Sequence, residues 1–290
     1  MSSIPTTKEK LFFWSAFSGL SSILIASSTY LFKTLFDNDP DPSDPPNIIP
    51  NEHPDTSSYE INPNELNESD LYLDGTLTKK GIAILYYHIT KLGEALIKKE
   101  YPTLESDRRS NVDNTELFSQ YAGQSIKASQ VAWEIASKTI LSKLSNKLTF
   151  EELSDKFQSF DPNEFDDIIV RIYPLSEDDK KVEPTTAKEA LQFYTNLSVQ
   201  GFEELHSQFK PSFAELSTEE EKIQMFTIYK INEAATKTKI DDKLFMKYNL
   251  KEISIKTILY RNNLYNDNEV KECLKKLNEI NKGLTIDDIK

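Results

Sequence analysis

The residue types that most often perform chemistry in proteins are few in this sequence and widely spaced. Its three histidines are His53, His88 and His206, and its single cysteine is Cys273. One thiol cannot form an internal disulfide, and no second cysteine is present to complete a thiolate zinc site. The seven glycines form no phosphate-binding loop, and no motif marks a nucleophile. We therefore expect no enzyme, no catalytic residue and no small-molecule substrate.

A short polar segment in the middle of the chain resembles part of a calcium-binding unit. Residues 145–157 read SNKLTFEELSDKF, which looks like the second half of an EF-hand of the calmodulin superfamily. The resemblance implies a helix, a twelve-residue loop and a second helix. Calcium takes six to eight oxygen ligands, so a working loop has oxygen donors at positions 1, 3, 5 and 9, glycine at 6 and Glu at 12. Similar loops starting near residues 70, 105, 141 and 175 resemble a tandem array.

The loop at 105–116 keeps the most acids, and the resemblance makes them the candidate metal ligands: Glu105, Asp107, Asp113 and Glu116. Arg109 and Ser110 occupy positions 5 and 6, where an oxygen ligand and a glycine belong. A guanidinium at that place opposes a divalent cation and favours an ion pair with Asp107 or Glu105. We therefore expect no cofactor, and any Ca²⁺ binding to be weak.

Apolar residues after Thr78 recur at helical spacing, which indicates an all-α fold of antiparallel helix pairs. Capping boxes starting at Thr149 and Ser217 mark helix starts, whereas Pro184 and Pro211 suggest breaks. An unrelated helical bundle with short polar loops fits the pattern as well as an EF-hand-like array. The α-helical domain is expected at 64–290, with two lobes dividing near 175–185. The expected helices are 82–101, 114–142, 149–160, 163–173, 185–206, 218–234, 241–248, 252–262 and 267–279.

A long uncharged segment precedes this domain. Residues 11–32 contain no charged side chain, and at about 1.5 Å per residue a helix of this length crosses a hydrocarbon core of roughly 30 Å. We therefore predict an N-terminal tail at 1–10 and a single transmembrane anchor at 11–36. The alternative is a signal peptide, with residues 1–28 removed by cleavage. Lys8 and Lys10 favour the N-terminus on the cytoplasm-like or matrix-like side.

The predicted anchor carries small residues on one face, which would allow another helix to approach closely. Serine hydroxyls that bond back to their own helix are an equally good explanation. The candidate helix-packing residues of the anchor are Ser15, Ser18, Gly19, Ser22 and Ala26.

An acidic, proline-rich tether at 37–63 is expected to join the anchor to the helical domain. It contains seven of the thirteen prolines, so neither a helix nor a sheet can propagate through it. Eleven acids and no Lys or Arg lie between Asp37 and Thr78, which accounts for most of the net charge of −13. Such a charge predicts no binding to nucleic acid. The tether serves as a plain spacer or as a docking strip for a basic partner.

Together these features predict a membrane-anchored helical scaffold or accessory subunit of a larger membrane complex, which acts through protein–protein contacts. The alternative is a calcium-responsive EF-hand regulator of a membrane protein. A membrane-anchored EF-hand array broadly resembles the regulators of the mitochondrial calcium uniporter, which favours a mitochondrial membrane as the location. The expected partners are the membrane, through a single span, and other subunits of the complex.

Overall fold

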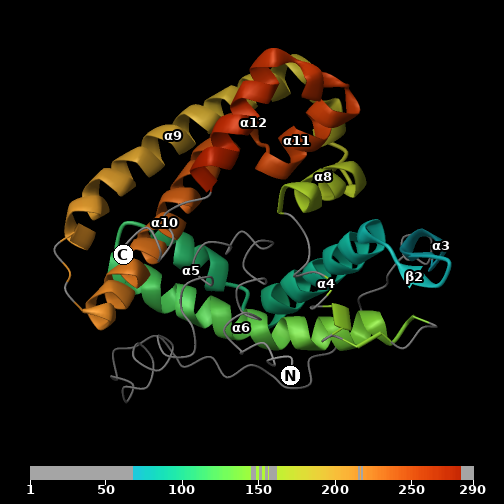
Figure 1. The fold of residues 1–290 in the computed structure, drawn as a ribbon, viewed down its shortest axis with the longest axis horizontal. Helices are drawn as coiled ribbons and strands as arrows, with labels where there is room; N and C mark the ends of the chain where they lie inside the picture. Colours follow the sequence, from blue (N-terminus) through green and yellow to red (C-terminus); the bar gives the residue numbers. More distant parts are fainter. Residues whose placement is uncertain are drawn as a thin grey trace. The chain divides into compact units, whose positions relative to one another are not determined.

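A computed structural model describes residues 68–144, 148–149, 152–153, 156, 162–214, 216 and 218–281. Helices make up 81% of the described part, which confirms the predicted all-α class (Figure 1). The chain forms two compact units that divide between Ile169 and Val170. This boundary lies upstream of the 175–185 region predicted from the sequence, and each unit is described below by itself.

The first unit is built on two long helices, α4 (Lys79–Glu100) and α6 (Thr115–Leu141), which pack along each other. The short helix α5 (Leu104–Ser110) connects them and also packs on α6. The core between them is apolar and includes the fully buried side chains Leu85, Ile89, Phe118 and Ile140. Helix α8 (Pro162–Ile172) follows, and its Phe165 ring meets Tyr86 of α4 edge-on.

A small β-hairpin precedes α4 and was not predicted from the sequence. It follows the single-turn helix α3 (Glu68–Leu71) and pairs β1 (Tyr72–Leu73) with β2 (Thr76–Leu77). Asp74 and Gly75 both have positive φ, at 52° and 75°. An Asp-Gly pair favours this two-residue turn because it tolerates positive φ at both positions. The same dipeptide falls within the loop that starts near residue 70, where the EF-hand resemblance would make Gly75 the turn glycine.

The hairpin returns the chain onto the start of α4. The Leu71 carbonyl accepts hydrogen bonds from the Thr78 backbone N–H at 2.9 Å and from its hydroxyl at 3.1 Å. Thr78 Oγ1 in turn caps α4 by accepting from the Gly81 N–H at 2.9 Å. A Cβ atom on Gly81 would lie only 2.2 Å from the Leu71 oxygen. Glycine is therefore required where α3 crosses α4.

The second unit consists of helices gathered around α9 (Pro184–Ala214), which packs against α10 (Glu219–Tyr248), α11 (Glu252–Arg261) and α12 (Asn268–Asn281). Figure 1 shows α9 and α10 as two long neighbouring helices. The 3₁₀ turns η1 (Asp179–Lys181) and η2 (Leu264–Asn266) precede α9 and α12. Leu191, Leu244, Ile255, Leu259 and Val270 are fully buried in this unit.

Two predicted breaks are wrong. Helix α10 is continuous through the segment between 234 and 241, where threonines lower helix propensity. The Thr238 hydroxyl donates to the Ala234 carbonyl at 2.9 Å, and Ile240 and Leu244 are buried, so the helix is maintained by its packing. Helix α9 extends past Pro211, which lies in its last turn.

The helix starts agree with their capping signals to within one residue. Thr149 and Glu152 form the expected reciprocal box: the Glu152 N–H donates to Thr149 Oγ1 at 3.2 Å, and the Thr149 N–H donates to Glu152 Oε2 at 2.9 Å. The second box uses Thr218 and Glu221, one residue after the predicted pair that begins at Ser217. In the described part, no helix is both long enough and apolar enough to cross a membrane. The predicted anchor and its packing residues lie outside that part.

Candidate functional site

The four acids proposed as calcium ligands lie on two helices and the turn between them. Glu105 and Asp107 are on α5, Asp113 is in the turn after it, and Glu116 is in the first turn of α6. Positions 1 to 6 of the expected loop are therefore helical. Within the described residues, no three His, Cys, Asp or Glu side chains gather in a way that could hold a metal ion.

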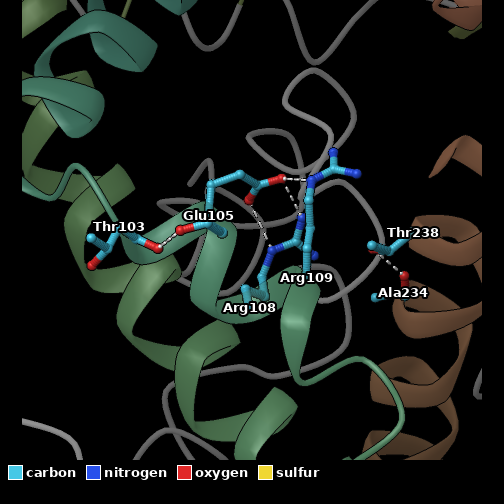
Figure 2. A network of polar contacts seen from close by, with 7 residues as sticks. Thr103, Glu105, Arg108, Arg109, Ala234 and Thr238 are labelled. Atoms are coloured by element: carbon cyan, nitrogen blue, oxygen red, sulfur yellow. Dashed lines mark hydrogen bonds and ion pairs between the residues drawn. The ribbon is translucent and has the colours of Figure 1, made fainter. Parts of the chain in front are cut away.

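The Glu105 carboxylate is hydrogen-bonded to two arginines, as Figure 2 shows. Arg108 donates from Nε to Oε2 at 3.0 Å and from Nη2 to Oε1 at 2.9 Å, which is a two-point contact between planar groups. Arg109 donates from Nε to Oε1 at 2.7 Å. The expected ion pair between Arg109 and Glu105 is therefore present. Burial alone would raise the pKa of Glu105, but the hydrogen bonds and charges of Arg108 and Arg109 outweigh it and lower this pKa.

Arg108 explains why the carboxylate is held in this position. Its side chain is 2% exposed, and its guanidinium lies 5.5 Å from the centre of the Phe118 ring. A buried cation is costly unless a negative group neutralises it. Glu105, one turn earlier on α5, supplies that group, so it neutralises the guanidinium that packs against Phe118 of α6.

The second unit contains a polar network that the sequence did not indicate, in which Tyr194 and Lys256 are buried and Lys237 and Glu252 are half-buried. Glu252 of α11 accepts from the Tyr194 hydroxyl of α9 at 2.8 Å and from the Lys256 ammonium at 2.8 Å. Lys237 of α10 lies 3.5 Å from the same carboxylate. Burial raises the pKa of Glu252, but Lys256 and Lys237 outweigh it and hold the pKa well below its usual range. Burial, with the charges of Glu252 and Asp241, raises the pKa of Tyr194 far above its usual value.

A second polar chain links α9 and α10. His206 Nε2 and Tyr229 Oη share a hydrogen bond of 2.8 Å, the Tyr229 hydroxyl lies 3.3 Å from Glu233, and Lys230 pairs with Glu233 at 2.7 Å. Burial lowers the pKa of His206; the Glu233 charge opposes this effect and the Lys230 charge adds to it. Three residues of this chain, Tyr229, Lys230 and Glu233, are buried.

These networks connect helices, and each basic group lies beside an acid. The only local signals in the sequence are the Lys230/Glu233 and Glu252/Lys256 spacings of three and four residues, which are common on ordinary helix surfaces. Nothing local points to the contact of Tyr194 with Glu252 or to that of Tyr229 with His206, because the packing of separate helices brings these partners together. The arrangement is suited to fixing helix positions.

Comparison with known proteins does not assign a function to this chain. No family model, no curated protein and no solved structure matches this chain.

Proposed function

We propose that this protein is a membrane-anchored helical scaffold or accessory subunit of a membrane complex, and that it acts through protein–protein contacts. The observation that carries the proposal is the uncharged segment 11–32, followed by an acidic, proline-rich tether. Such an order of segments holds a helical domain away from a bilayer that its own anchor enters. A mitochondrial membrane remains the favoured location.

The described part supports a scaffold through the way its polar groups are used. Ion pairs and hydrogen bonds fasten α9, α10 and α11 through Tyr194, Lys237 and Glu252. In the first unit, Arg108 of α5 packs against Phe118 of α6 and is neutralised by Glu105 of its own helix. Helices held in fixed positions present fixed faces, which is what a subunit needs in order to recognise a neighbour.

The test is crosslinking with mass spectrometry in the native membrane, combined with changes in the anchor. Replacing Ser18, Ser22 and Ala26 with leucine should preserve insertion, because leucine is more apolar, but should loosen assembly by blocking close helix approach. The matched control replaces Ser21 and Ser28 with leucine, because both lie away from the small-residue face of the expected helix. Native gels should show a smaller complex for the first variant alone.

The same experiment can also contradict the proposed function. Unchanged migration of the Ser18/Ser22/Ala26 variant would leave the anchor without a packing role. Absence of reproducible crosslinks to any other membrane subunit would overturn the scaffold proposal. The calcium-responsive regulator remains the second candidate, and it is separated from the first by the calcium titration described below.

A further inference from the structure

The last turn of α10 exposes two neighbouring large apolar side chains. Phe245 is 51% exposed and Met246 is 86% exposed. In the described part, four large apolar side chains are strongly exposed, and only these two are adjacent in the chain: Leu73, Ile228, Phe245 and Met246.

This exposure does not come from a frayed helix end. Leu244 and Leu250, on either side of the pair, are 1% and 2% exposed, so the turn is packed onto its own unit. Asn249 ends the helix in the left-handed conformation, with φ at 54°, and its backbone N–H donates to the Phe245 carbonyl at 2.7 Å. Phe245 and Met246 are therefore held outward by an ordered helix terminus.

Three lysines lie within a few residues of this pair in the chain. Lys243, Lys247 and Lys251 are all exposed. The Lys247 ammonium lies 4.0 Å from the centre of the Phe193 ring, so that ring contributes to the same surface. We define the aromatic–lysine patch as Phe193, Lys243, Phe245, Met246, Lys247 and Lys251.

Three acids, Asp241, Asp242 and Glu252, lie in the same segment and are less exposed than the lysines. Glu252 accepts a hydrogen bond from the Tyr194 hydroxyl, and Asp241 also hydrogen-bonds to Tyr194, so both acids belong to the polar network around Tyr194. Asp242 is half-buried. The exposed side chains of the patch are thus basic and apolar, in contrast to the net negative charge of the whole chain.

We infer that the aromatic–lysine patch docks the second unit onto the anionic surface of a lipid bilayer. This inference rests on the proposed membrane anchor, which would keep the patch close to such a surface. Phe245 and Met246 would enter the boundary between headgroups and acyl chains, and the lysines would meet the anionic headgroups while their alkyl stems lie along the apolar part. Charge complementarity favours a bilayer over an acidic protein, because a fluid layer of anionic lipid accommodates three spaced lysines together with two apolar side chains.

The experiment places an environment-sensitive fluorophore on the full chain. A Met246→Cys variant is made in a Cys273→Ser background and labelled, and a Leu73→Cys variant labelled in the same way is the control, because Leu73 is 68% exposed on the hairpin of the first unit. Both proteins are reconstituted into phosphatidylcholine vesicles, with or without about one-third phosphatidylglycerol. Quenching by spin-labelled lipid reports contact with the bilayer.

The probe at position 246 should shift to the blue and be quenched in the anionic vesicles, and both effects should weaken at high salt. Changing Lys243, Lys247 and Lys251 to glutamine should reduce its quenching to the level seen with phosphatidylcholine alone. Circular dichroism checks that this variant is folded. A probe at 246 that remains in water, that is quenched equally in both vesicles, or that behaves like the probe at 73 would overturn the inference.

A separate measurement distinguishes this inference from the proposed anchor. If carbonate washes the full chain off membranes, the anchor fails, but the patch is still testable by co-sedimentation of the full chain with the same two vesicles. We then expect binding to the anionic vesicles alone, reduced about tenfold or more by the three Lys→Gln changes, since each lysine near an anionic surface adds severalfold to affinity. Equal binding by the variant would reject the patch whatever the anchor does.

Discussion

Arg108 is a buried cation, and Glu105 supplies the negative group that it requires. We predict that Glu105→Gln destabilises the protein by about 1–2 kcal/mol, because a buried guanidinium loses its neutralising partner while the exposed side of Glu105 is screened by solvent. The measurement is the free energy of unfolding in denaturant. Arg109→Gln is the control: it removes only the exposed partner of the same carboxylate and should cost less than about 1 kcal/mol. Equal losses in the two variants would contradict the role given to Arg108.

His206 makes the stability of the second unit depend on pH. Burial lowers its pKa, so the folded chain favours the neutral imidazole more than the unfolded chain does. Its stabilising contribution is therefore full above the unfolded pKa near 6.5 and is lost as the pH falls below that value. We expect the thermal unfolding midpoint to be lower at pH 5.5 than at pH 7.5, and this difference to be larger in the natural protein than in the His206→Gln variant. The same fall in both proteins would show that other groups are responsible.

At the scale of elements, helix crossings depend on particular glycines. We predict that Gly81→Ala lowers stability by about 1–3 kcal/mol, because its Cβ would meet backbone atoms of Leu71. Backbone atoms cannot move aside as a flexible side chain can. Gly93→Ala is the matched control. Its Cβ would approach the Trp133 side chain at 3.3 Å, and the higher helix propensity of alanine offsets that contact. Thermal unfolding of both variants tests the difference, and a harmless Gly81→Ala would contradict the close crossing of α3 over α4.

Calcium binding also belongs at this scale, because a loop is required to hold the ion. We expect the natural chain to bind Ca²⁺ no more tightly than the 10⁻⁴ to 10⁻³ M class, since both oxygens of Glu105 are engaged by arginines. Isothermal titration of the full chain in detergent measures this affinity. The Arg109→Asp/Ser110→Gly double variant restores the expected ligand and turn glycine, and gains affinity only if the segment adopts EF-hand geometry. A micromolar dissociation constant in the natural chain would favour the calcium-responsive regulator.

The sequence predicts elements better than it predicts their junctions. Apolar periodicity locates α4 and α6 to within a few residues because their buried faces recur every three to four residues. It does not reveal α5, whose seven residues include only one apolar side chain, Leu104. The pairing of Arg109 with Glu105 could be predicted from the sequence, yet that of Arg108 with Glu105 could not, because Arg108 is buried through packing on α6. Tyr194 and Glu252 are 58 residues apart, and only the folded helices bring them together.

At the scale of the whole molecule, the described helices bury their own apolar faces within each of the two units, as Leu85 does in the first and Leu259 in the second. A domain with such a core needs no lipid in order to fold. We therefore predict that removing residues 1–36 yields a soluble, helical protein. Circular dichroism should give a helical spectrum with a cooperative thermal transition, and size-exclusion chromatography should show no aggregation.

The intact chain provides the complementary measurement. With residues 11–32 retained, it should stay in the membrane fraction after alkaline carbonate extraction, because a span of 22 uncharged residues is held by the hydrocarbon core. A protein attached only through the aromatic–lysine patch would be released, since carbonate removes proteins bound at the headgroups. Release of the intact chain would therefore exclude the anchor, whereas retention of the intact chain and solubility of the shortened one would together assign membrane attachment to the first 36 residues.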